Sequence, residues 1–503
     1  MRRATFSAFA LLLCSSYSAY GQEHPHVGQP ERLGTVHFAT SCSPAVTAKF
    51  DRAVALLHSF EFGASIRGFN DVLAVDSTCA MAYWGLALSR WSNPMSVANR
   101  PATLLQQGSQ LAGSGVRLAA RATDRERDYI NAVSQLYDDY AHRDQPTRVE
   151  AYSRAMDSLS QRQPADTEAK IFYAISLVAA ASPADKTYAN QLKAGAILEA
   201  LWAKQPNHPG LAHYIIHTYD YPPLADKARA AAARYSTIAP SAAHALHMPS
   251  HTFTRVGMWK ESVDANERSS EVALGSGSIA EALHAADYEM YAYLQLGDYA
   301  KAKAILDRLP AMAARFDPNA ITGAAPPLAG YFAIAAIPAR WALERQAWSE
   351  AAALEPKATD YPYTEAMTYF ARAIGASHTG DLEKARASID SLAAIKQRLT
   401  AKNEPYWAGQ VAIQQLGAQA WLDLAQHRNE DALKQMREAA ALDDATEKQA
   451  VTPGPLAPAH ELLGDMLMQL GQTSEARAEY QLTLQKEPKR RRSTSQLASK
   501  GSE

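Results

Sequence analysis

The sequence has few cysteines and no excess of charge of either sign. Among 503 residues there are 3 cysteines, and the formal net charge is −2 at pH 7. A nearly balanced charge gives no reason to expect nucleic acid or an anionic membrane surface as a partner. The mean hydropathy of −0.28 is typical of a soluble protein.

Short motifs that would indicate a reaction are also missing. The sequence has no Gly-rich phosphate loop, no nucleophile elbow and no convincing catalytic triad. The segment from His213 to His217 lacks the glutamate of the H-E-x-x-H helix, which disfavours a metalloprotease. Catalytic residues therefore stay unknown at this level.

The first residues have the pattern of a targeting segment. Arg2 and Arg3 are followed by an apolar stretch from Phe6 to Leu13, and Ala19-Tyr20-Gly21 offers a small-x-small cleavage site. We predict a signal peptide over residues 1–21 and an exported protein, periplasmic or secreted. The apolar stretch is too short to span a bilayer, so we expect no transmembrane anchor.

Two cysteines remain once the signal peptide is removed. Cys42 and Cys79 lie near one end of the chain. In an oxidising compartment they can form a disulfide, and the alternative is a pair of buried, inert thiols.

The two ends of the mature chain differ from its middle. Residues 22–44 are predicted to be a flexible N-terminus. Residues 489–503 begin with four basic residues and continue with Ser, Thr and Gln, which predicts a disordered basic tail. Residues 45–488 are rich in helix formers.

This middle region repeats at about 34 residues. Its clearest unit runs from Ala457 to Pro488, where small residues recur at the positions that let two helices approach. The same frame recurs in units that start near Pro209, Ala243, Leu283, Phe332, Ala366 and Ile413. The pattern predicts an all-α superhelix of roughly ten helix pairs.

These units resemble the tetratricopeptide repeat (TPR) superfamily over most of residues 45–488. The segments His213 to His217 and His244 to Arg255 are similar to a subfamily of exported bacterial TPR proteins. Since no settled activity belongs to that subfamily, the resemblance implies a solenoid fold and a concave groove, and no chemistry.

Histidines are concentrated in the central units, residues 205–300. In TPR proteins, positions 2, 5, 9, 12 and 13 of a first helix face the concave groove. This frame predicts a metal-binding cluster from the histidines and one aspartate that occupy such positions: His213, His217, His244, His247, His251, His284 and Asp287. Four further side chains are candidates for binding a groove ligand: Asp220, Arg255, Tyr291 and Arg340.

The chemistry of the cluster rests on helical spacing. His213/His217 and His247/His251 are i, i+4 pairs, so each pair lies on one helix face, and the two helices are neighbours. The imidazoles could reach a common divalent metal, zinc or iron, since both accept histidine nitrogen and carboxylate oxygen.

Three interpretations remain open for this cluster. It can be a metal site, a groove for a protein, peptide or small anionic ligand, or a buried polar network. The function is accordingly either a ligand- or metal-binding scaffold or a metal-dependent hydrolase or oxygenase.

Overall fold

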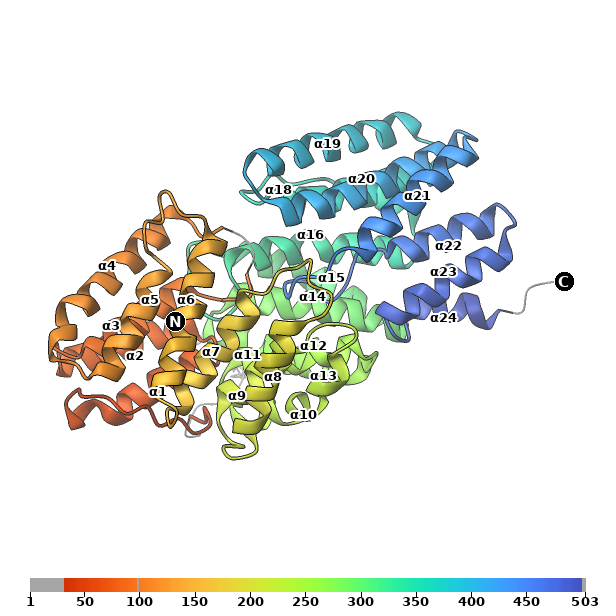
Figure 1. The fold of residues 1–503 in the computed structure, drawn as a ribbon. Helices are drawn as coiled ribbons and strands as arrows, with labels where there is room; N and C mark the ends of the chain where they lie inside the picture. Colours follow the sequence, from red (N-terminus) through yellow and green to blue (C-terminus); the bar gives the residue numbers. More distant parts are fainter. Residues whose placement is uncertain (1–30, 97–98, 500–503) are drawn as a thin grey trace, which may run out of the picture. The chain divides into compact units, whose positions relative to one another are not determined.

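The computed structural model of the protein describes residues 31–96 and 99–499. These residues form helices and connecting loops, with no β-strand among them (Figure 1). The all-α fold class is therefore confirmed. The predicted signal peptide, residues 1–21, lies outside the described residues.

The helices follow one another as consecutive packed pairs, and each helix contacts its neighbours in sequence. The first part of the chain contains α1 (Thr47–His58), α2 (Phe62–Val75), α3 (Ala80–Trp91), α4 (Ala102–Leu118), α5 (Asp124–Gln135), α6 (Gln145–Arg162), α7 (Thr167–Ala179) and α8 (Ala189–Trp202). The middle contains α9 (Pro209–Thr218), α10 (Arg229–Ile238), α11 (Ala243–His247), α12 (Pro249–Arg255), α13 (Trp259–Ser276), α14 (Ile279–Leu296), α15 (Tyr299–Ala314), α16 (Pro327–Glu344) and α17 (Trp348–Ala352). The last part contains α18 (Pro362–Thr379), α19 (Leu382–Ala401), α20 (Pro405–Ala425), α21 (Asn429–Asp444), α22 (Ala459–Gln469), α23 (Thr473–Lys486) and α24 (Arg491–Ala498).

The pair α22/α23 shows why the repeat forms. A Cβ atom on Gly464 would lie 2.7 Å from the Tyr480 ring, so only glycine allows this close approach of the two helices. Gly471 has φ +77°, a conformation that suits glycine and turns the chain between the helices. Ala476 is fully buried between them. The helix pair predicted at Ala457–Pro488 is confirmed.

The N-terminal segment is folded where the structure describes it, contrary to the flexible N-terminus predicted for residues 22–44. Leu33, Val36 and Phe38 are buried in the core. Glu126 forms a capping box with Thr123 at the start of α5. The same carboxylate accepts hydrogen bonds from the backbone nitrogen of Ser41 at 2.7 Å and from the Ser41 hydroxyl at 2.6 Å. Apolar burial and a shared helix cap therefore fix this segment to the helices.

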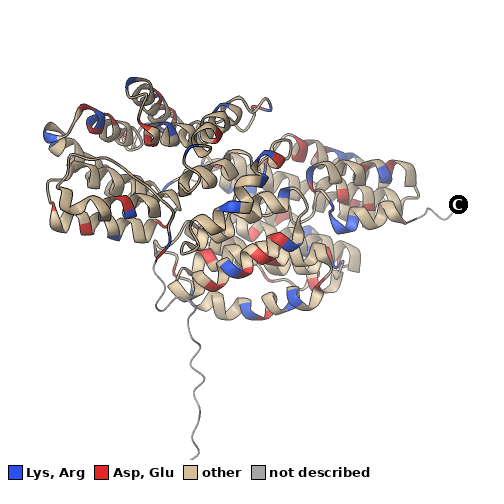
Figure 2. Cartoon of the chain, turned by 90° about the horizontal axis from the view of Figure 1, so that it is seen from below, with Lys and Arg blue, Asp and Glu red and all other residues tan. Residues whose placement is uncertain are grey.

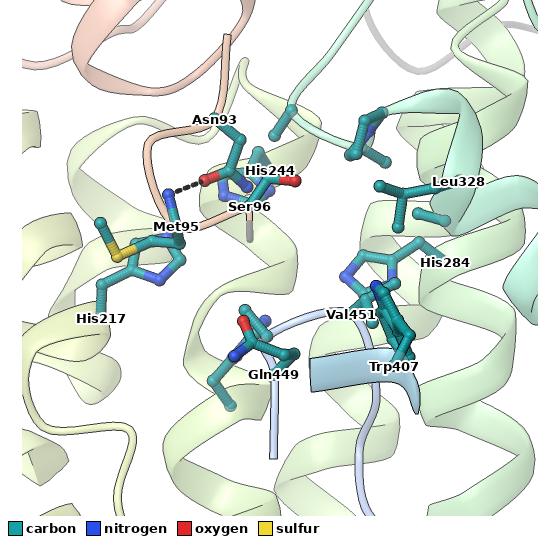
Figure 3. Close-up of a pocket in the computed structure, with 16 residues that line it drawn as sticks. Asn93, Met95, Ser96, His217, His244, His284, Leu328, Trp407, Gln449 and Val451 are labelled. Atoms are coloured by element: carbon teal, nitrogen blue, oxygen red, sulfur yellow. Dashed lines mark hydrogen bonds between the residues drawn. The ribbon is translucent and has the colours of Figure 1, made fainter. Parts of the chain in front are cut away.

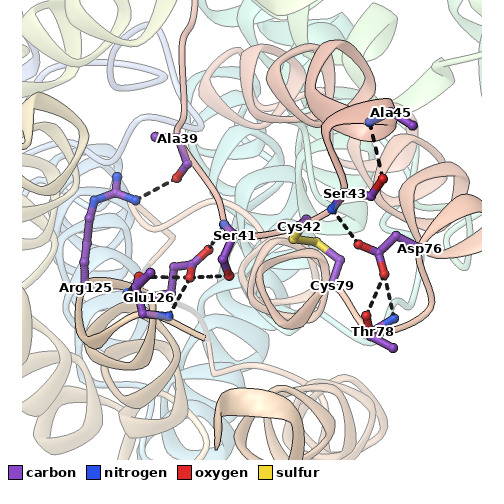
Figure 4. Close-up of a disulfide and its surroundings, with 11 residues drawn as sticks. Ala39, Ser41, Cys42, Ser43, Ala45, Asp76, Thr78, Cys79, Arg125 and Glu126 are labelled. Carbon is purple, nitrogen blue, oxygen red and sulfur yellow. Dashed lines mark hydrogen bonds between the residues drawn. A yellow bond between two sulfur atoms is a disulfide. The ribbon is translucent and has the colours of Figure 1, made fainter. Parts of the chain in front are cut away.

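Cys42 and Cys79 are joined by a disulfide next to that contact (Figure 4). Asp76 accepts a hydrogen bond from the backbone nitrogen of Ser43 at 2.8 Å and bonds Thr78, which precedes the second cysteine. Of the two states that the sequence left open, the structure has the disulfide.

The basic C-terminal segment is a second correction. It was predicted to be a disordered tail over 489–503, but α24 forms there, and Arg490 is 1 % exposed. The guanidinium of Arg490 binds the carboxylates of Glu461 and Glu344, which lie on α22 and α16. Buried carboxylates require a cation, so this arginine is held inside the protein.

The C-terminal third folds back on the middle of the chain. Trp259 donates to the backbone oxygen of Lys489 at 3.2 Å, and α24 contacts α14. We call residues 445–455, between α21 and α22, the strap. Its Lys448 binds Asp220, in the loop after α9, and its Thr452 accepts a hydrogen bond from Arg340 of α16. The open concave wall expected from the repeat frame is thus covered at the histidine-bearing helices.

The apolar core has three parts along the chain, within residues 33–248, 243–341 and 332–480, apart from Ala324, which packs with the first. Acidic and basic residues are interspersed along the helices (Figure 2). In the described ranges, no helix combines the length and the apolar character needed to cross a bilayer.

Candidate metal centre

Six histidines of the middle region form two groups, where the first two parts of the core meet. In each group a ring nitrogen of every histidine lies within 4.8 Å of the other two. None of the six residues is more than 6 % exposed. The first triad is His213, His217 and His244, and the second triad is His247, His251 and His284.

Four helices supply the two triads. The pair on α9, His213 and His217, is completed by His244 of α11, and the pair His247/His251 is completed by His284 of α14. The i, i+4 spacing therefore keeps each pair together, as expected from helix geometry. The two pairs belong to separate groups, and each takes its third member from a helix two further along the chain, α11 after α9 and α14 after α12.

A proline divides the helical segment that carries three of the six histidines, His244, His247 and His251. α11 ends at His247 and α12 begins with Pro249, which has no N–H to continue the hydrogen-bond ladder. The backbone nonetheless keeps helical dihedral angles at Met248, φ −54° and ψ −35°. His247 and His251 therefore stay one turn apart across the break.

The first triad has three unpartnered nitrogens. His213 Nδ1 donates to the backbone oxygen of His58 at 2.6 Å, and His244 Nδ1 donates to the Glu281 carboxylate at 2.9 Å. The Nε2 atoms of His213, His217 and His244 are buried and have no hydrogen-bond partner among the described residues. Buried polar atoms are nearly always satisfied, so three such atoms in one place require an explanation.

The second triad has a conflict between two lone pairs. Asn266 donates its Nδ2 to a backbone oxygen at 2.7 Å, so its Oδ1 accepts from His247 Nδ1 at 2.6 Å. His251 Nδ1 donates to the Asp220 carboxylate at 2.9 Å. In the neutral rings both Nε2 atoms are then bare acceptors, yet they lie 3.0 Å apart. A cation between them, either a proton or a metal ion, resolves the conflict.

Burial favours the neutral rings. It lowers the pKa of His213, His217 and His247 well below the usual range, and neighbouring histidines lower it further. It also lowers the pKa of His251, and it lowers that of His284 to about 3. Because a proton is disfavoured on these rings, their lone pairs are available to a metal ion.

The outer partners match those of known metal sites in kind. A metal-bound histidine usually donates its other N–H to a carboxylate or carbonyl oxygen, which fixes the tautomer. Glu281, Asp220, Asn266 and the backbone oxygen of His58 supply four such acceptors. Three nitrogens bound to one tetrahedral zinc are about 3.3 Å apart, so small side-chain rotations bring either triad onto an ion.

Asp287, predicted as a metal ligand, lies outside both triads. Arg340 of α16 binds its two carboxylate oxygens at 2.7 and 3.3 Å. The guanidinium also donates to Thr452 of the strap at 2.9 Å. The Asp287 carboxylate is therefore engaged by an arginine two helices further along the chain and not by a histidine triad.

The other predicted groove residues are also engaged within the chain. Asp220 binds Arg255 at 2.8 Å and Lys448 of the strap at 3.2 Å. Burial raises the pKa of Asp220, but Lys448 and Arg255 outweigh it and hold the pKa well below the usual range. Tyr291 donates to Glu487 at 3.0 Å and accepts from Arg490 at 3.1 Å.

A third cluster has a different character. Glu168 lies between His58 and His208 and accepts from Nε2 of each ring at 2.9 Å. Tyr214 bonds the other nitrogen of His58 at 3.1 Å. The carboxylate satisfies the two facing nitrogens, which leaves His208 Nδ1 as the one ring nitrogen of this cluster without a partner among the described residues, against three in the first triad.

A pocket of about 40 Å³ opens beside the triads (Figure 3). His217, His244 and His284 turn toward it, with Met95 near His217 and Trp407 near His284. Its wall also includes residues 93–96, 324–329 and 449–451. His217 in addition lines a larger cavity of about 590 Å³ that reaches Lys448.

Sequence reasoning missed most of the surroundings of the triads. Glu281 stands one turn before His284 and could have been noticed on the same helix. Asn266, Met95, Trp407 and Gln449 carry no local signal, because they reach the centre only through the packing of distant segments.

Comparisons with known proteins assign no family to the chain. No known protein family and no curated protein matches the chain. Among solved structures, yeast Tom70 is 13 % identical, covers 90 % of this chain and 94 % of its own, and has a TM-score of 0.39. The APC/C hetero-tetramer Cut9–Hcn1 is 11 % identical, with 90 % and 75 % covered and a TM-score of 0.37. The human IFIT1 dimer with PPP-AAAA is 14 % identical, with 79 % and 72 % covered and a TM-score of 0.31.

Proposed function

We propose that this protein binds transition-metal ions at the two triads and presents them to a small molecule in the adjoining pocket, as a metal-dependent enzyme does. The observation that carries the proposal is the arrangement of bare nitrogens. Three buried Nε2 atoms of the first triad are unpartnered within the described residues, and two Nε2 atoms of the second triad face each other at 3.0 Å.

The ligand set favours a catalytic over a structural metal. Structural zinc sites have four protein ligands, whereas catalytic zinc has three and keeps one position for water or substrate. Each triad supplies three imidazoles, and four of the six histidines line the pocket. Imidazole nitrogen suits zinc and copper. Non-haem iron is usually held by two histidines and one carboxylate, and neither triad contains a carboxylate.

A small molecule fits this site better than a peptide. The four residues predicted to bind a groove ligand are each engaged within the chain. Asp220 pairs with Arg255, Tyr291 bonds Glu487, and Arg340 pairs with Asp287. The strap covers the side where a peptide would lie. The pocket and the larger cavity beside it remain as the space for a ligand.

Metal content tests the proposal directly. Protein produced with zinc, copper and iron supplied is analysed for bound elements, and then chelated and titrated with each ion. We expect stoichiometric zinc or copper, and an ion at 100 times its Kd should stabilise the fold by about 2.7 kcal/mol. The double variant His213→Gln/His247→Gln should lose this metal and this stabilisation.

The variant His142→Ala is the matched control. His142 is exposed and belongs to neither triad, so its removal should leave metal content unchanged. Circular dichroism shows whether the double variant is folded. Wild-type protein that retains no metal and gains no stability from any of the three ions would rule out the proposal.

We also propose that the protein functions in an oxidising compartment outside the cytoplasm. The disulfide between Cys42 and Cys79 supports this, since such bonds persist in secreted proteins. Cell fractionation with thiol labelling tests it. Chain found in the reducing cytoplasm, with both thiols free, would contradict it.

A further inference from the structure

One pocket contacts both triads. His217 and His244 of the first triad and His251 and His284 of the second line the same cavity (Figure 3). Ions held at the two triads would therefore face a common space, and a ligand in that space could contact both.

The two triads also contact each other directly. The ring centroids of His217 and His251 are 5.9 Å apart, and those of His244 and His247 are 5.8 Å apart. His244 and His247 lie on the same short helix, α11, and belong to the first and the second triad respectively. In two-metal enzymes the ions are about 3.5–4 Å apart and share a ligand. The triads are close enough for this arrangement.

Charge indicates what the shared ligand is. Six neutral imidazoles bring no negative charge to offset two divalent ions. Asp220 is already neutralised by Arg255 and Lys448, which leaves two carboxyls beside the first triad: Glu281, bonded to His244 Nδ1, and Glu61, which accepts from the backbone nitrogen of His244 at 3.4 Å. Even together they carry fewer negative charges than two divalent ions carry positive ones. Uncompensated charge in a buried site is strongly unfavourable, so an anion is needed between the ions.

The size of the pocket limits that anion. A cavity needs about 10–15 Å³ to hold one water molecule, and this one has about 40 Å³. Hydroxide, fluoride or azide fits such a space. A larger organic substrate can approach only from the side of His217, which borders the larger cavity.

We infer that the two triads form one dinuclear metal centre, in which a small anion in the pocket bridges the two ions. This inference rests on the proposed function and deepens it. Metal-bound hydroxide, formed when water in the pocket releases a proton to solvent, is the natural bridging ligand, and it is a nucleophile poised beside any substrate in the larger cavity.

Spin coupling between two copper ions tests the inference. Chelated protein is loaded with Cu²⁺, the copper is counted by elemental analysis, and the electron paramagnetic resonance signal is integrated. We expect about two coppers per chain and a signal that accounts for less than half of them, because a bridging anion couples their spins. Azide should then bind at one per two coppers.

Single-triad variants provide the internal standard. His217→Ala and His284→Ala each disrupt one triad, so we expect about one copper per chain with its full signal. Copper retained by His213→Gln/His247→Gln measures binding elsewhere and is subtracted.

The inference and the proposed function fail in different ways. Two coppers with a signal that accounts for half or more of them, or a single copper in the wild-type chain, would overturn the dinuclear centre and leave metal binding intact. No copper or zinc above the level of the double variant would overturn the proposed function itself.

Discussion

Two kinds of buried histidine cluster stand side by side in this protein. In the first kind, Glu168 lies between His58 and His208 and accepts from both rings at 2.9 Å. In the second kind, the first triad bonds outward through Nδ1 of His213 and of His244 and leaves its three Nε2 atoms without a partner among the described residues, while in the second triad two Nε2 atoms face each other at 3.0 Å. Both kinds are fully buried and similar in composition.

The difference shows that the number of histidines says little about metal binding. What matters is the partner of the second ring nitrogen. A carboxylate at the centre completes a structural network, whereas acceptors at the periphery direct several lone pairs toward one point, where a single cation can satisfy them together.

The largest expected effect is on the structural cluster. Glu168→Ala leaves two buried rings without their acceptor, so we expect a loss of about 3–5 kcal/mol in the free energy of unfolding at pH 7, with metal content unchanged. Denaturant titration measures the loss. The isosteric Glu168→Gln should lose less. A loss of metal together with a small change in stability would break the comparison.

The opposite outcome is expected in the first triad. His217→Phe should weaken metal binding there by more than about 100-fold, since outer-shell partners alone are worth 10–100-fold. The metal-free variant should differ from the metal-free wild type by less than about 1 kcal/mol, because the lost nitrogen had no partner. His208→Phe is the matched control, and it should lower the stability of the metal-free protein while leaving the metal affinity unchanged. Competition with a chromophoric chelator reports the affinity.

The outer acceptors should have an intermediate effect. Asn266→Ala removes the group that fixes the tautomer of His247, so we expect affinity at the second triad to fall about 10–100-fold, and that at the first triad to stay the same. Stepwise metal titration separates the two sites. An equal loss of metal affinity at both triads would show that Asn266 does not act on the second triad alone.

The most gradual expected effect concerns Glu289, a buried carboxyl outside the histidine clusters. Burial raises the pKa of Glu289 from 4.5 to about 7, although Arg308 opposes this. Between these values the folded state binds more protons than the unfolded state, so the contribution of Glu289 to stability falls as pH rises. Glu289→Gln should remove this fall, at about 1 kcal/mol per pH unit. Denaturation from pH 4.5 to 7.5 checks it; an identical slope in both proteins would contradict it.

Sequence predicts the helix pairs well because the signals are local. Gly464, Ala476 and the Thr123 capping box act within one or two helices. The same frame brings the six histidines to one region. It could not predict that Arg340 would take Asp287, or that Lys448 would reach Asp220 from 228 positions away. Such pairings depend on how the C-terminal third returns, and no short pattern records that.

The position of the strap in the pocket wall also determines when, during synthesis and folding, the pocket can form. Cys42 and Cys79 are separated by 37 positions and can meet early during synthesis. The walls of the pocket come from residues between 93 and 451, so they exist only after nearly the whole chain has emerged and the strap has docked. Before that stage the histidines of α9 to α14 are already synthesised, but the pocket wall does not yet cover them. Under the proposed function, the choice of metal ion would therefore fall to the last stage of maturation, when an incomplete centre can take up whichever metal is most abundant.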